Sequence, residues 1–172
     1  MKNFNPIESV YKKKLKTVQL KLRQDCIVDP SDNGVIKINT WDQLHEILTS
    51  LYDRLDDGQE HMLMLVLNPG LDIIGFKVIS SGFQHFNAVD MKIIFRNALF
   101  LGATEIILTH NHTSGLLIPS KEDIKFTQNA IKAGSILSIP VADHFIYTHR
   151  GLVSMRIEDY CSFDAPAEAI SP

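Results

Sequence analysis

The chain has 172 residues, of which 45% are hydrophobic and 22% charged, and its formal net charge is −3. This length and composition are typical of one globular domain and argue against a disordered chain. The net charge does not favour a general nucleic-acid binder. No apolar run approaches the ~20 residues that a membrane-spanning helix needs, so we expect no contact with a membrane.

Cysteine usage and the first residues bear on the compartment. The two cysteines, Cys26 and Cys161, form no CxxC pair and no cluster, so each is expected to be a small apolar side chain instead of a ligand or disulfide partner. The first eight residues lack the apolar segment of a secretory signal. These features predict a cytoplasmic protein. The sequence does not indicate an oligomeric state.

The first 23 residues are basic, with seven Lys or Arg side chains against the single acidic Glu8. Residues 10–23 end in alternating apolar and polar positions, which predicts a strand with one solvated face. We expect residues 1–38 to form an arm and a turn that belong to the same unit as the rest. Such an arm could contact the phosphates of DNA. The alternative is an edge strand that its lysines protect from aggregation.

Hydrophobic periodicity and capping residues predict an α/β domain. In chain order we expect a helix over 40–55, strands over 61–67 and 71–79, a helix over 90–101, a strand over 104–108, a helix over 120–134, and strands over 138–142, 144–148 and 152–155. Thr40 or Asn39, Asp90 and Ser120 are the expected N-caps, and Gly102 closes the second helix. Residues 39–160 then form one mixed sheet sandwiched by helices, and residues 161–172 a flexible tail.

Two histidines follow the buried strand at 104–108. His110 and His112 are two residues apart, so in an extended segment their imidazoles point to one side and can approach one metal ion. Asp123, after a short loop with Gly115 and Pro119, can supply a third ligand. Three protein ligands leave one position for water, which is how a catalytic zinc is held.

Each part of this pattern has a simpler explanation. A bare His-x-His is weak evidence, because two polar residues in a loop are common. Ser120-x-x-Asp123 resembles a capping box at the start of a helix. Capping and ligation do not compete, however, since a carboxylate in the first turn is already favoured by the helix dipole. The combination of four residues with fixed gaps therefore favours a metal site.

The same residues resemble a known motif. His110-Asn-His112 with Ser120-x-x-Asp123 is similar to the JAMM motif of the JAB/MPN metalloproteases. The string from Ile107 to Gly115 is closer still to the RadC branch, in particular to its short members without an N-terminal helix-hairpin-helix region. The resemblance implies the JAB/MPN fold, a cytidine-deaminase-like α/β architecture, and a Zn²⁺ ion on both histidines and the aspartate.

The family also implies two catalytic side chains, a general-base glutamate and a serine that assists the oxyanion, here Ser120. Glu60 stands at the start of the 61–67 strand, where such proteins place the base. Glu105 begins the buried strand and Glu122 should project away from Asp123, so neither fits. The implied activity is zinc-dependent hydrolysis of a peptide or isopeptide bond in a protein substrate.

Other interpretations stay open at this point. The RadC branch is historically linked to DNA repair, and a DNA-associated accessory module with a structural or vestigial metal site is the main alternative. An HNH nuclease is disfavoured, since its histidines are more widely separated. Asn111, Ser114, Asp143 and His144 are left without a definite role; Asp143-His144 could orient a ligand or be a structural pair.

Overall fold

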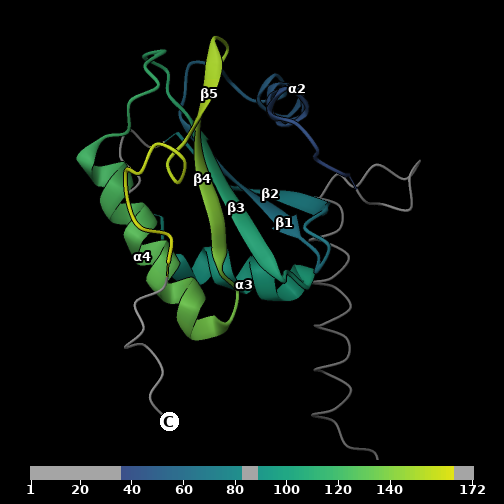
Figure 1. The fold of residues 1–172 in the computed structure, drawn as a ribbon. Helices are drawn as coiled ribbons and strands as arrows, with labels where there is room; N and C mark the ends of the chain where they lie inside the picture. The colour runs from purple at the N-terminus through teal and green to yellow at the C-terminus, as the bar shows by residue number, and fades with distance from the viewer. Residues whose placement is uncertain (1–35, 83–88, 165–172) are drawn as a thin grey trace, which may run out of the picture.

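The computed structural model describes residues 36–82 and 89–164 (Figure 1). The predicted basic arm and most of the C-terminal tail lie outside these residues, so the predicted strand at 10–23 and its contact with DNA stay predictions. None of the helices in the described ranges is long and apolar enough to cross a bilayer.

A mixed five-stranded sheet forms the centre of the molecule, in the order β2-β1-β3-β4-β5. Its strands are β1 (His61–Leu67), β2 (Ile73–Ser81), β3 (Glu105–Asn111), β4 (Val141–Thr148) and β5 (Gly151–Ser154). Only β3 and β4 are parallel, and the other neighbours are antiparallel. The predicted α/β class with a mixed sheet is confirmed.

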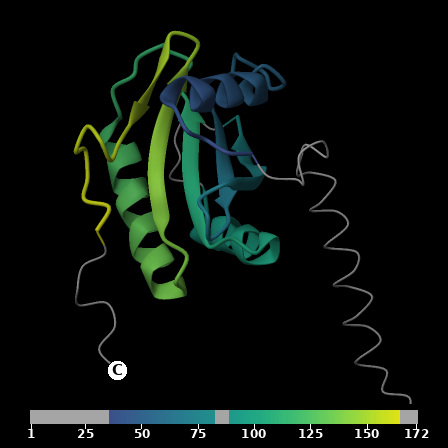
Figure 2. The same ribbon diagram turned by 45° about the vertical axis from the view of Figure 1, so that its right-hand side comes forward.

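Helix α2 (Trp41–Tyr52) covers one face of this sheet (Figure 2). Thr40 is its N-cap and accepts a hydrogen bond from the backbone N–H of Gln43 at 3.2 Å. The buried face of α2 packs on alternate residues of the central strands, among them Leu63 and Leu65. The helix ends at Tyr52, earlier than predicted, and the Tyr52 ring stacks on Tyr147 of β4 with 4.5 Å between ring centroids.

Helices α3 (Met91–Leu101) and α4 (Lys121–Leu137) cover the opposite face. The intervening residues of the same strands point to this side, and Met62, Met64 and Leu108 pack with Phe95 and Phe126 from the two helices. The caps are those predicted. Asp90 begins α3, and Gly102 ends it in the left-handed conformation at φ 71°.

The prediction that the third helix ends at Gly134 is wrong. Helix α4 continues to Leu137, and Ser138 takes the left-handed cap position at φ 54°. A glycine is needed at position 134 for lack of space, because a Cβ there would lie 2.5 Å from the carbonyl oxygen of Ile139. The chain thus turns closely over Gly134 as it leaves the helix and enters β4.

The prediction of two strands over 138–148 is also wrong, since this segment forms the single strand β4. Asp143 interrupts the apolar pattern but makes no turn. Its buried carboxylate accepts hydrogen bonds from the backbone N–H of His144 at 2.7 Å and from the hydroxyl of Ser154. These partners satisfy the polar group within the sheet, so the strand runs on without a break.

Candidate metal centre

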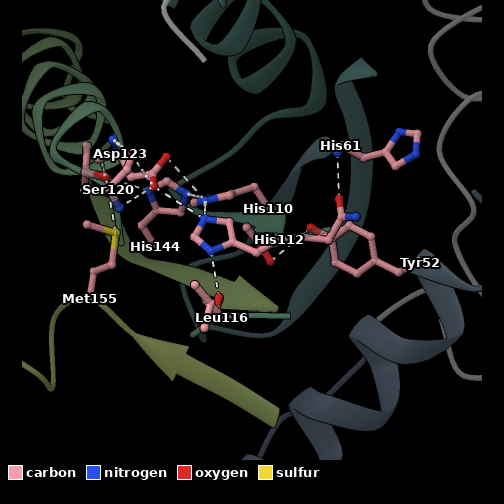
Figure 3. A network of polar contacts seen from close by, with 12 residues as sticks. Tyr52, His61, His110, His112, Leu116, Ser120, Asp123, His144 and Met155 are labelled. Atoms are coloured by element: carbon pink, nitrogen blue, oxygen red, sulfur yellow. Dashed lines mark hydrogen bonds and ion pairs between the residues drawn. The ribbon is translucent and has the colours of Figure 1, made fainter. Parts of the chain in front are cut away.

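The C-terminal end of β3 and the N-terminal end of α4 meet at the centre of the predicted site. Strand β3 carries His110 and ends at Asn111, and His112 follows directly. Asp123 lies in the first turn of α4, on the helix face toward the sheet. Figure 3 shows the side chains of His110, His112, Ser120 and Asp123 gathered in one place. The structure thus brings together the three side chains that the sequence suggested as ligands.

The three ligand atoms lie close together. Nε2 of His110 is 2.9 Å from Nε2 of His112. Each of these nitrogens lies 3.4 Å from an oxygen of Asp123, His110 from Oδ1 and His112 from Oδ2. His110 is fully buried and Asp123 is 3% exposed, whereas His112 is partly accessible.

This arrangement fits a zinc ion. Zinc bonds of 2.0–2.2 Å in a tetrahedron place neighbouring ligand atoms about 3.3 Å apart, close to the three distances here. Two imidazoles and a carboxylate are also a donor set typical of zinc. In the part of the chain that the structure describes, these residues form the one cluster of three His, Cys, Asp or Glu with suitable spacing.

A capping box holds Asp123 in place. Its Oδ2 accepts hydrogen bonds from the backbone N–H of Ser120 at 2.7 Å and from the Ser120 hydroxyl at 2.6 Å. The Ser120 hydroxyl oxygen in turn accepts the backbone N–H of Asp123 at 3.0 Å. Oδ2 is therefore the oxygen that accepts the capping hydrogen bonds, and Oδ1 is the oxygen that faces His110. The predicted capping box is confirmed, and the same carboxylate lies beside both histidines.

The surroundings of the cluster shift the pKa of all three proposed ligands. Burial lowers the pKa of His110, and its hydrogen bond with Asp123 only partly opposes this. Burial alone would raise the pKa of Asp123, but hydrogen bonds with His110 and His112 hold it well below its usual range. At His112 burial is outweighed by hydrogen bonds with Asp123 and the Leu116 carbonyl, which raise its pKa. Metal binding needs a carboxylate and neutral histidines, so the lowered pKa values of Asp123 and His110 favour it, whereas His112 has to release its proton.

Behind His110 lies a second buried histidine, His144 of β4. The parallel register pairs His144 with Leu108, so it shares a sheet face with His110 two residues further along β3. Nε2 of His144 is 2.8 Å from Nδ1 of His110, and its Nδ1 is 2.6 Å from the hydroxyl of Thr127. The sequence left His144 open and missed Thr127, although Thr127 stands one helical turn after Asp123.

Glu60 stands just before β1, as predicted. The antiparallel register pairs Met62 with His110. Glu60 lies two residues before Met62 and His112 two residues after His110, so continuing the register places Glu60 opposite His112. Directly opposed residues of an antiparallel pair point to the same face, which favours a position for Glu60 on the side of the metal ligands. The Glu60 charge also acts to raise the pKa of His112. Glu105, in contrast, begins β3 and pairs with Leu67 at the other end of the strand.

Asn111 points to the opposite face of β3 from its histidine neighbours and contacts the segment around Glu60. Its Oδ1 accepts the backbone N–H of His61 at 2.7 Å, and its Nδ2 donates to the carbonyl oxygen of Gln59 at 2.9 Å. The sequence left Asn111 without a definite role, and these bonds give it a structural one. Ser114 accepts the backbone N–H of Leu116 at 3.3 Å and so helps order the loop.

A cavity of about 320 Å³ opens beside His112, between the end of α2, the loop after β3 and the β4–β5 turn. Most of its lining residues are of polar type, among them Asp56, Asp57, Ser114 and Arg150. His61 is buried under this region, and its ring nitrogens contact the Ser81 hydroxyl and the Asp56 carbonyl oxygen. It therefore has a structural role. Of the three proposed ligands only His112 lines the cavity.

Comparison with known proteins agrees with this geometry. The RadC-like JAB domain family matches residues 38–160. A UPF0758 protein of Gloeothece citriformis is 36% identical over 120 residues, which are 70% of this chain and 49% of that protein. A UPF0758 protein of Methanococcoides burtonii is 36% identical over 132 residues, or 77% and 57%. The chain thus spans about half the length of the curated relatives it matches. On this match, and with its mixed sheet and His-His-Asp cluster, the chain belongs to the RadC-like JAB domain family.

Proposed function

We propose that this chain is a zinc-dependent hydrolase that cleaves a peptide or isopeptide bond. The observation that supports this most is the convergence of His110, His112 and Asp123 at tetrahedral spacing, with Glu60 just before the start of the neighbouring strand β1. Structural zinc sites use four protein ligands, whereas catalytic sites use three and keep one position for water or substrate. A cluster of three ligands, with His112 partly accessible, favours the catalytic kind.

Zinc bound to these side chains would supply Lewis acidity, which lowers the pKa of a bound water from 15.7 to about 7 and polarises a carbonyl group. The chain's own contribution begins with Glu60. Its carboxylate can accept a proton from the attacking water and deliver it to the leaving amine, which is general base and then general acid catalysis. The C–N bond breaks as the amine takes this proton, and the new C–O bond completes a carboxylic acid. The second proton of the water then passes from the acid to the released amine, which leaves a carboxylate and an ammonium group.

The single hydroxyl proton of Ser120 would be needed in two different hydrogen bonds. In this structure the hydroxyl donates to Oδ2 of Asp123. To assist the oxyanion, it must rotate and donate to the substrate oxygen instead. Such a donor is worth on the order of 3 kcal/mol in the transition state. Ser120 is exposed to solvent, so the hydroxyl has room for this rotation, and the backbone N–H of Ser120 can hold Asp123 alone during the step.

The experiment combines metal analysis with turnover. We expect the purified chain to bind about one zinc, and His112→Ala to lose it, since one of three ligands is gone. Glu60→Gln should keep the zinc and lose turnover of peptide and isopeptide-linked substrates, because the amide cannot accept the proton. Glu122→Gln is the matched control: Glu122 is exposed on the first turn of α4 and should leave both unchanged. A chain without zinc affinity would refute the proposal, and an active Glu60→Gln would refute the role of Glu60.

A further inference from the structure

The buried side chains behind His110 form a continuous chain of hydrogen bonds between two of the proposed ligands. It runs from Nδ1 of His110 to Nε2 of His144 at 2.8 Å, and from Nδ1 of His144 to Oγ1 of Thr127 at 2.6 Å. Oγ1 of Thr127 then reaches the carbonyl oxygen of Asp123 at 2.7 Å. His110, His144 and Thr127 are all fully buried.

The direction of this chain follows from its last bond. A backbone carbonyl oxygen can only accept, so the one hydroxyl proton of Thr127 goes to Asp123. The hydroxyl oxygen must then accept from His144, which places the proton of His144 on Nδ1. In a neutral imidazole the other nitrogen is an acceptor. Nε2 of His144 therefore accepts from Nδ1 of His110.

The consequence is a defined tautomer at His110. With its proton on Nδ1, the lone pair of Nε2 points toward His112 and Asp123. His112 reaches the same state independently, because its Nδ1 lies 2.7 Å from the carbonyl oxygen of Leu116, which can only accept. Both imidazoles thus aim Nε2 at the same point, and the proton of the 2.9 Å contact between the two Nε2 atoms is the one that a metal would displace.

We propose that His144 and Thr127 are positioning residues that fix His110 as a metal ligand by setting its tautomer. The inference rests on the proposed metal site. The backbone of His144 is held in turn, because its N–H donates to Asp143 at 2.7 Å. Outer partners of this kind typically change metal affinity 10- to 100-fold when they are removed.

The first test is spectroscopic and needs neither metal nor activity. In the metal-free full chain with ¹⁵N-labelled histidines, at about pH 8, above the usual histidine pKa of ~6.5, long-range ¹H–¹⁵N correlations report which ring nitrogen carries the proton. We expect Nδ1–H at both His110 and His144. A proton on Nε2 of either residue would overturn the inference, whether or not the chain binds zinc.

The second test compares two substitutions of one residue. Thr127→Val removes the hydroxyl, so we expect about 10- to 100-fold weaker zinc affinity and a mixture of tautomers at His144. His112 should keep its Nδ1 proton, because the Leu116 carbonyl oxygen accepts it. Thr127→Ser retains the hydroxyl and should retain both properties. Unchanged zinc affinity in Thr127→Val would contradict the inference and leave the proposed hydrolase intact. If the unmodified chain itself had no affinity for zinc, the proposed hydrolase function would be refuted instead.

Discussion

Asn111 accepts the backbone N–H of His61 at 2.7 Å, so a side chain from β3 holds the residue that follows Glu60. The same amide donates to the carbonyl oxygen of Gln59, which precedes Glu60. The two peptide groups around Glu60 are therefore tied to the strand that carries His110. This clamp fixes the backbone of the proposed base relative to the proposed ligands.

Removal of this clamp should slow turnover and spare the metal. In Asn111→Ala we expect kcat to fall roughly 10- to 100-fold, since a misplacement of about 1 Å near the reacting atoms can cost on the order of 100-fold. Zinc content should stay at the level of the unmodified chain. Asn129→Ala, which removes an exposed amide from α4, is the control. Equal turnover in Asn111→Ala and Asn129→Ala would show that the clamp does not position Glu60.

Chelation of the metal should lower the melting temperature. A ligand at about 1,000 times its Kd stabilises the folded state by about 4 kcal/mol, which for a chain of this size corresponds to roughly 8–16 °C. We expect a decrease of this order when zinc is removed, measured by thermal unfolding. In His112→Ala the chelator should have no effect. An equal shift in both proteins would mean that the metal binds elsewhere.

Ser120 should affect both stability and turnover. In Ser120→Ala the loss of the N-cap should cost about 0.5–2 kcal/mol, measured by denaturation of the metal-free chain. Turnover should fall by about 100- to 1,000-fold if the hydroxyl also assists the oxyanion. Ser120→Thr keeps a hydroxyl and should keep most of the stability and most of the turnover. A loss of stability with full turnover in Ser120→Ala would limit the serine to its capping role.

The packing of α2 on the sheet should be a main source of stability. Leu48 is fully buried between α2 and the central strands, so Leu48→Ala should lower the free energy of unfolding by about 2–5 kcal/mol. Glu46→Ala, an exposed position of the same helix, should change it by less than about 0.5 kcal/mol. Similar values for the two variants would indicate that α2 is only loosely attached.

Much of the site is encoded locally and could be predicted from the sequence. The caps at Thr40, Asp90 and Ser120 depend on bonds between residues two or three positions apart. The helices and strands follow from periodicity, because burial of one face requires it. The spacing of His110 and His112 on an extended segment likewise suggested a shared direction before any fold was known.

The remaining features depend on contacts between distant parts of the chain. No local pattern indicates that Gly134 gives room to Ile139, so the end of α4 and the start of β4 were misplaced. The partnership of His110 with His144 depends on the register of β3 and β4, which are joined through α4. The sequence by itself determined which side chains could bind a metal. The tertiary structure decided which groups orient them, because strand pairing sets the position of residues that are far apart in sequence.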